Sequence, residues 1–166
     1  MSFDQVDYLC HMFLKKLVIP IACLFIIGCE ESSLYQKVVF FPEQAWSYSN
    51  RPVFNFNISD TSAKYRVFFV FRHTDAYEYN NIWIQLASHL PGDTTSRSDR
   101  FNIPLANEKQ WLGTGMDDIY DHRVLLYPQP IQFKKAGNYS VECKQDMRID
   151  PLNHVMNVGL RLEKVN

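Results

Sequence analysis

Apolar and polar residues alternate along much of this chain. In residues 54–58, phenylalanine and isoleucine take every second position and asparagine fills the positions between them. Similar alternation occurs at residues 82–87, 101–105 and 139–143. Because successive side chains of a β-strand point to opposite faces of a sheet, this pattern predicts strands with one buried face and one solvent-facing side.

Residues 65–71 have a different pattern, because apolar side chains occupy both sets of alternating positions, apart from Arg66. This predicts a central strand that is covered on both faces. Pro104 cannot donate a hydrogen bond to a neighbouring strand, so the segment at 101–105 is expected at a sheet edge or at a bulge. Further short strands are predicted at 38–41, 124–127, 131–133 and 158–162.

Turn-forming residues separate these segments, at 59–62, 91–93 and 136–138. No long amphipathic helix is apparent, and single helical turns are expected at 117–121 and 150–153. Short strands separated by loops predict an all-β domain, specifically a two-sheet antiparallel β-sandwich of Ig-like or jelly-roll type.

The segment at 139–143 carries two further expectations. Tyr139 opens a predicted strand directly after a turn, which is typical of a tyrosine corner, where the hydroxyl bonds back to the upstream backbone. Cys143 falls on the inward set of alternating positions. It is therefore expected to be a buried structural thiol, not a nucleophile, because no activating base stands beside it in sequence.

The N-terminal segment has the features of a secretory signal. Lys15 and Lys16 precede the apolar run 17–27, which is followed by Gly28 and Cys29. As a helix this run would reach only ~16 Å, about half the thickness of a bilayer core. A basic region, a short apolar region and a small residue are typical of a signal peptide. The alternatives are a buried core segment and an uncleaved anchor.

The end of this signal resembles a bacterial lipobox, which predicts that Cys29 becomes a lipidated N-terminus. The expected modification is a covalent diacylglycerol and an N-acyl lipid such as palmitate, with no other cofactor. We therefore expect a lipoprotein signal peptide at 1–28, a lipidated tether at 29–33 and the β-sandwich domain at 34–166. Two acidic residues precede the basic region, so translation is predicted to start at Met12.

Charge and cysteine content exclude some classes of protein. The chain has 17 Lys and Arg against 18 Asp and Glu, a net charge of −1, which argues against a general nucleic-acid binder. Aromatic residues make up 14% of the chain, which favours strands. Cys10 and Cys23 leave with the predicted signal and Cys29 carries lipid, so Cys143 remains alone and no intramolecular disulfide is expected.

A cluster of acidic residues is the most polar candidate site. Asp117, Asp118 and Asp121 precede His122 and follow two glycines at 113–115. Carboxylates bind Ca²⁺, but the spacing matches no EF-hand loop, and no P-loop Lys-Ser/Thr follows the glycines. In a purely structural alternative, Asp117 or Asp118 caps one helical turn and the glycines supply positive φ. A loop that contacts a partner is the third interpretation.

The sequence gives no basis for assigning a catalytic residue. Ser88 and His89 are adjacent, but neighbours in a strand point to opposite faces and cannot pair directly. The remaining histidines are scattered without metal-ligand spacing, and no pair of carboxylates suggests glycoside chemistry. We therefore expect a protein that is not an enzyme and holds no metal, although residues far apart in sequence can converge in space.

Aromatic residues supply a second class of candidates. Trp46, Tyr48, Trp83, Trp111 and Tyr120 include rings that must lie outside the core. On a β-sandwich, exposed rings stack on sugars; alternatively, these rings close the ends of the sandwich or line a protein interface. The candidate partner or ligand contacts are Trp83, Trp111, Asp117, Asp118, Tyr120 and Asp121.

Several separated segments carry a resemblance to a known family. Besides the lipobox that ends at Cys29, these segments are 79–83, 111–121, 136–139, 145–148 and 158–161. Together they resemble the GldH-type gliding-motility lipoproteins of Bacteroidetes over essentially the whole mature chain. Cys29 is the one functional position that this resemblance transfers.

The resemblance implies a lipid-anchored protein of the cell envelope, at the outer membrane, without enzymatic activity. In gliding species the motility apparatus is linked to the type IX secretion machinery. The implied partners are the membrane, through the lipid on Cys29, and envelope proteins such as other gliding-motility lipoproteins, with no nucleic acid. Family members also occur in non-gliding relatives, where a role in envelope protein assembly is the alternative. An envelope glycan-binding module is the second functional hypothesis.

Overall fold

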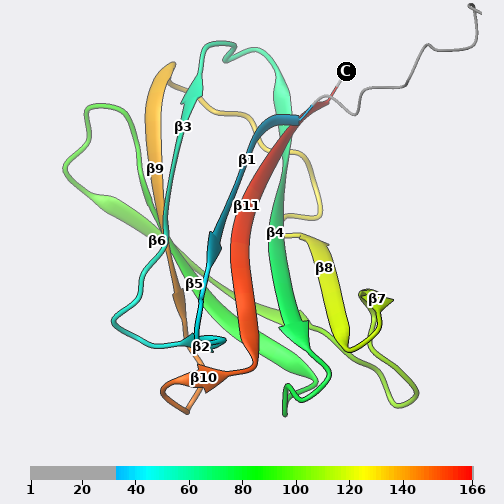
Figure 1. Ribbon diagram of the computed structural model, residues 1–166. Helices are drawn as coiled ribbons and strands as arrows, with labels where there is room; N and C mark the ends of the chain where they lie inside the picture. Colours follow the sequence, from blue (N-terminus) through cyan, green and yellow to red (C-terminus); the bar gives the residue numbers. More distant parts are fainter. Residues whose placement is uncertain (1–32, 166) are drawn as a thin grey trace, which may run out of the picture. The chain divides into compact units, whose positions relative to one another are not determined.

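The computed structural model describes residues 33–165, which form eleven β-strands (Figure 1). The strands are β1 (Ser33–Phe40), β2 (Ala45–Trp46), β3 (Val53–Ile58), β4 (Lys64–Thr74), β5 (Asn81–His89), β6 (Ser96–Pro104), β7 (Thr114–Met116), β8 (Ile119–Leu125), β9 (Gly137–Gln145), β10 (Leu152–Asn153) and β11 (Val155–Val165). All their pairings are antiparallel, which confirms an all-β domain. Within residues 33–165, no helix is long and apolar enough to cross a bilayer.

The strands form two larger sheets and one small one. The five-stranded sheet has the order β1-β11-β4-β8-β7, and the four-stranded sheet has the order β3-β9-β5-β6. Strands β10 and β2 pair separately. Strands β1 and β11 lie side by side, so the two ends of the described chain meet in one sheet (Figure 1). Strand β6, which ends at Pro104, is an edge strand, as expected.

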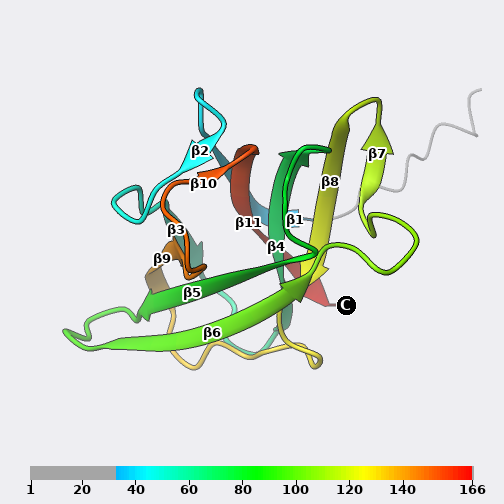
Figure 2. The ribbon, with the colours of Figure 1, turned by 90° about the horizontal axis from the view of Figure 1, so that it is seen from below.

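The buried faces of the two larger sheets share one hydrophobic core, which gives a sandwich-like arrangement (Figures 1 and 2). In β3 the buried and exposed residues alternate strictly, as the sequence pattern predicts. The largest side chains that are fully buried include Trp46, Phe54, Tyr65, Phe69 and Phe71. Assignment of this strand order to the Ig-like or jelly-roll class stays a prediction.

Strand β4 is central, but the expectation that both of its faces are covered is wrong. Its inward residues are buried, whereas Phe68 and Val70 are half-buried on the outer face of the five-stranded sheet. Phe68 lies in register with Leu125 and Arg161, and the Arg123 guanidinium lies 5.6 Å from its ring centroid. The stems of long arginine side chains shield these apolar residues without a second layer of structure.

Other local predictions are wrong where turn and strand signals overlap. The single helical turn expected at 117–121 is replaced by the hairpin of β7 and β8, and the one at 150–153 gives way to strand β10. The strand predicted at 124–127 begins earlier, at Ile119. The segment 131–133 forms no strand of its own, because Ile131 makes one isolated bridge, to Tyr65.

Candidate functional site

Two of the predicted contact residues, Trp111 and Tyr120, belong to a cluster of rings on the inner side of β4 and β8. The ring centroid of Trp111 lies 4.5 Å from that of His73 and 5.6 Å from that of Tyr120. The rings of Tyr77 and His122 each lie 5.0 Å from His73. These five residues are called the imidazole cluster below. Trp111 and Tyr120 therefore pack against other rings and do not form an open platform.

A buried pair of histidines lies at the centre of the imidazole cluster. The Nε2 atoms of His73 and His122 are 2.9 Å apart, and both residues are buried. Burial lowers the pKa of His73. Burial, together with the charge that His73 would carry, lowers the pKa of His122 to about 4, against the opposing effect of Asp121. The pair is therefore uncharged near neutral pH and forms a hydrogen bond within the core.

The register of β4 and β8 brings these imidazoles together. Phe71 is paired with His122, and His73 is paired with Tyr120, so the histidines are diagonal neighbours on the inner face. A side chain at Gly113 would place its Cβ 2.8 Å from Nε2 of His122. The segment before β7 can therefore pass this closely only because residue 113 lacks a side chain.

The acidic residues do not converge on one point. Asp121 lies on the outer face and forms a two-pronged ion pair with Arg72, with N–O distances of 2.6 and 2.7 Å. Asp117 and Asp118 form the two-residue turn between β7 and β8, where Asp117 has a φ of 53°. Within residues 33–165, no three or more His, Cys, Asp or Glu side chains are grouped so as to hold a metal ion.

Two structural expectations for this segment are wrong. Neither Asp117 nor Asp118 caps a helix, because the residues that follow are paired as a strand. Among the glycines of the described chain, positive φ occurs at Gly92 and Gly137, not at Gly113 or Gly115. These last two glycines are required by close approach, with a Cβ at Gly115 lying 2.8 Å from the Tyr120 ring.

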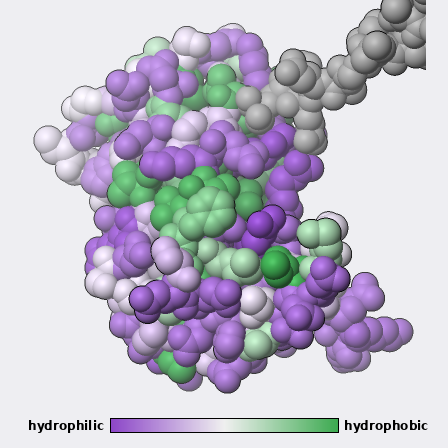
Figure 3. Space-filling model, in the orientation of Figure 1, coloured by the Kyte–Doolittle hydropathy of each residue, from purple (hydrophilic) through white to green (hydrophobic). Residues whose placement is uncertain are grey.

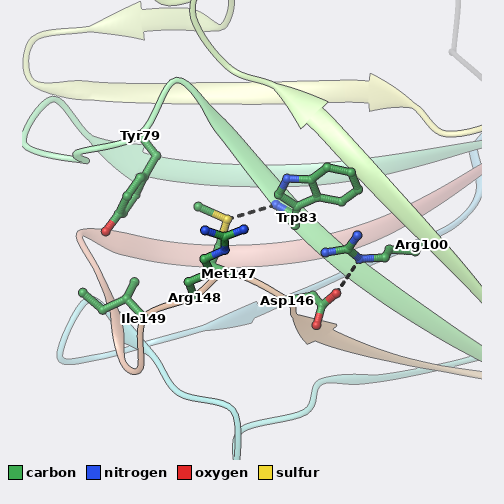
Figure 4. A pocket seen from close by; sticks show the side chains of 7 residues that line it. All are labelled: Tyr79, Trp83, Arg100, Asp146, Met147, Arg148 and Ile149. Atoms are coloured by element: carbon green, nitrogen blue, oxygen red, sulfur yellow. Dashed lines mark hydrogen bonds and ion pairs between the residues drawn. The ribbon is translucent and has the colours of Figure 1, made fainter.

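The remaining predicted contact, Trp83, lies in a surface hollow of about 550 Å³ (Figure 4). Trp83 comes from the outer side of β5, and Arg100 of β6 places its guanidinium carbon 3.9 Å from the indole centroid. Asp146 holds Arg100 through an ion pair of 2.5 Å. Met147 accepts a hydrogen bond from the backbone N–H of Trp83 at 3.2 Å. The other lining residues are Tyr79, Arg148 and Ile149.

This arrangement, called the Trp83 hollow below, favours binding and not proton transfer. An indole stacked with a guanidinium combines a flat apolar surface with fixed hydrogen-bond donors. Tryptophan and arginine are the residues most enriched among the energetically dominant contacts of protein interfaces. Ile149 adds an exposed aliphatic side chain at the rim. The hollow can thus accept a partner side chain or another flat group.

Comparison with known proteins gives the family of the chain. The family described as GldH lipoprotein matches residues 33–162. The chain belongs to the GldH lipoprotein family. The gliding motility lipoprotein GldH of Flavobacterium johnsoniae is 24% identical over 155 residues, covering 89% of this chain and 94% of that protein. A GldH homolog of Christiangramia forsetii is 26% identical over 145 residues, covering 82% and 87%.

Membership of the GldH family confirms the resemblance seen in the sequence and makes this chain a membrane-anchored lipoprotein of the cell envelope. Among solved structures, the crystal structure of the insecticidal delta-endotoxin Cry8Ea1 from Bacillus thuringiensis aligns at 18% identity with a TM-score of 0.34. That alignment covers 78% of this chain and 20% of the toxin. This similarity is too low to support a conclusion about fold or function.

For this GldH-family chain, the predicted contact residues thus do not form one site. Trp111 and Tyr120 join the imidazole cluster, Trp83 forms its own hollow, and the acidic residues lie in a turn and an ion pair. Cys29 lies outside the described residues. Sequence reasoning missed the histidine pair, because 49 positions separate its members. It also missed Arg100, because the contact of Arg100 with Trp83 depends on the register between β5 and β6.

Proposed function

We propose that this GldH-family lipoprotein is held in the outer membrane by lipid on Cys29 and acts, without enzymatic activity, by binding protein partners of the gliding machinery. The partners proposed are other gliding-motility lipoproteins of the apparatus linked to type IX secretion. The proposal is supported by similarity to a gliding motility lipoprotein along 94% of that relative's length. Since a lipoprotein cysteine carries two or three acyl chains, stable attachment follows from this one residue.

The observation that carries the binding role is the Trp83 hollow. Its indole and guanidinium are held in place before any partner arrives, by Asp146 and Met147. Groups that are already ordered lose less conformational entropy on binding. A protein side chain that enters the hollow would bury aromatic, aliphatic and thioether surface while its polar atoms meet Arg100.

Crosslinking in intact cells followed by pull-down tests this role. We expect the wild-type protein to capture envelope proteins of the motility apparatus and the Trp83→Ala variant to lose them. Gln85→Ala is the matched control, because Gln85 lies on the same outward face of β5 and does not line the hollow. Equal capture by the Trp83→Ala and Gln85→Ala variants would show that the hollow is not the partner-binding site.

Membrane fractionation tests the anchor separately. The Cys29→Ala protein is expected in the soluble fraction, whereas the wild-type protein sediments with membranes even at high salt. Sedimentation of Cys29→Ala with membranes at high salt would show that the anchor is elsewhere.

A glycan-binding role is the second candidate, and one observation favours it. The outer face of the four-stranded sheet around Trp83 is rich in amides and hydroxyls, including the bonded pairs Asn81–Asn102 and Gln85–Ser98. Such groups both donate and accept hydrogen bonds, as sugar hydroxyls require. Binding of purified envelope polysaccharide that is lost in Trp83→Ala, without protein capture, would support this candidate over the first.

A further inference from the structure

The outer face of the five-stranded sheet has an apolar centre that no other sheet of the described chain covers. Val38 of β1 and Val70 of β4 flank Gly159 of β11 in one cross-strand row. Phe68 lies in the adjacent row, next to Leu125. Figure 3 shows the resulting hydrophobic patch, bordered by hydrophilic residues. This surface is called the outer apolar face.

Most of the exposed large apolar side chains gather on or beside this face. Phe40, 66% exposed, continues the outward set of β1, and Leu125 extends the patch along β8. Met116, 76% exposed, lies on the outward side of β7, as does Thr114, which pairs with Asp121. Leu112 lines the same groove as Val70 and Leu125, and Leu34 stands at the bulge opposite Glu163.

The charged residues on the same side are mostly arginines. Four arginines and one lysine of the outward sets of β4, β8 and β11 stand against two carboxylates, a net charge of +3; the residues are Lys64, Arg66, Arg72, Arg123, Arg161, Asp121 and Glu163. The outer face of the four-stranded sheet differs, because amides and hydroxyls such as Asn57 and Asn138 dominate it. One outer side of the domain is therefore apolar and basic, and the other is polar.

The position of Cys29 limits how far this face can lie from the lipid. Three residues separate Cys29 from Ser33, where the edge strand β1 begins. The four Cα-to-Cα steps from Cys29 to Ser33 span at most about 14 Å when fully extended, since each step adds no more than ~3.6 Å. A tether this short keeps the β1 edge of the sheet close to the headgroups into which the lipid on Cys29 is inserted.

We infer that the outer apolar face lies on the lipid leaflet, with its exposed apolar side chains among the headgroups and its net positive charge facing the lipid phosphates. This inference rests on the proposed lipid anchor at Cys29. Apolar residues rimmed by basic ones are the composition that peripheral proteins present to anionic membrane surfaces. The Trp83 hollow, on the other sheet, then faces away from the lipid and is open to partners.

Site-directed fluorescence in reconstituted vesicles tests this orientation. The full lipidated chain would carry a polarity-sensitive thiol label at Phe40→Cys or Leu125→Cys, with Gln85→Cys as the matched control on the opposite face. Both target positions are exposed, and Cys143 is buried, so it does not compete for label. The vesicles contain phosphatidylcholine with or without phosphatidylglycerol.

We expect labels at 40 and 125 to show a blue shift, quenching by nitroxide lipids and protection from iodide, whereas the label at 85 shows none of these. Arg66→Gln should weaken the added protection that phosphatidylglycerol gives. Labels at 40 and 125 that iodide reaches as freely as at 85, in protein that floats with the vesicles, would overturn the orientation alone. Protein that does not float would overturn the anchor and the orientation together. Protection that appears in native envelopes but not in vesicles would assign the face to a protein partner instead.

Discussion

The Nε2 atom of His73 lies 2.9 Å from the Nε2 atom of His122, so one of the two must donate a hydrogen bond and the other must accept it. The Nδ1 atom of His73 lies 2.7 Å from the carbonyl oxygen of Thr74, which can only accept. Nδ1 of His73 therefore carries hydrogen, and in the neutral ring its Nε2 is the acceptor. The donor is Nε2–H of His122. Because both rings must be neutral for this hydrogen bond to form, its contribution to stability depends on pH.

Acidification is expected to destabilise the fold through this pair. The pKa of His122 in the folded state is about 4, below its ordinary value of 6.5, so the unfolded chain binds protons first as the pH falls. The stabilisation is complete above pH 6.5 and is lost progressively between pH 6.5 and 4. The total loss in the free energy of unfolding reaches about 3 kcal/mol. Urea unfolding across this range measures it.

The His122→Gln variant isolates this contribution. Its side-chain amide can still donate to His73 but cannot titrate, so the slope of stability against pH should flatten. His89→Gln, at an exposed position, serves as the control and should keep the wild-type slope. A slope that is unchanged in His122→Gln would mean that other groups cause the acid sensitivity.

The tyrosine corner is expected to contribute measurably to stability. The Tyr139 hydroxyl donates to the Lys135 carbonyl at 2.8 Å, and the residue is only 5% exposed. Tyr139→Phe leaves this carbonyl without its partner and should lower the free energy of unfolding by about 1 kcal/mol. Tyr48→Phe is the comparison, since its hydroxyl donates to the Met147 carbonyl at 2.7 Å from a residue that is 38% exposed. A larger loss in Tyr48→Phe would contradict the argument from burial.

Close approach at Gly113 gives a third prediction. An alanine there would bring its Cβ to 2.6 Å from the Asp121 carbonyl oxygen and 2.8 Å from the His122 ring. Because backbone must move to relieve this overlap, Gly113→Ala should cost about 1–3 kcal/mol of stability. Gly115→Ala meets only the ring of Tyr120, which can shift, so thermal melting should show a smaller loss.

Truncation of the two half-buried tryptophans, Trp83 and Trp111, should lower stability by different amounts. Trp111→Ala removes a ring that packs at 4.5 Å against buried His73, and should lower stability by about 3 kcal/mol. Trp83→Ala removes a ring on the outer side of β5 that is covered by Arg100, so denaturant unfolding should show a smaller loss. Equal losses would show that the Trp83 hollow is part of the packed core and not a preformed surface site.

The structural features that could be predicted from the sequence are those that depend on residues close together in the chain. Alternation located the buried faces of β3 and β9, Pro104 marked an edge strand, and Tyr139 was identified from the turn before it. Each of these signals is local, because a strand's period and a turn's residue types act within a few positions. Strand order is different, since the pairing of β1 with β11 joins opposite ends of the described chain.

The site could be predicted only in part for the same reason. Trp83 was identified as a surface aromatic, but its contact with Arg100 depends on the register of β5 and β6. His73 and His122 showed no spacing pattern, because the pairing of β4 with β8 brings them together. A glycine's identity does not distinguish positive φ from close approach, which is why the role of Gly113 was predicted wrongly.

Because Cys143 is buried, the reactivity of its thiol reports on opening of the domain. Its side chain is sealed in the core, and burial raises the pKa of the thiol, so alkylating reagents meet neither access nor thiolate while the sheets stay closed. Modification by such a reagent should therefore proceed only as fast as the sandwich comes apart. Timed alkylation of this one sulfur would then measure, in living cells, how often the domain opens.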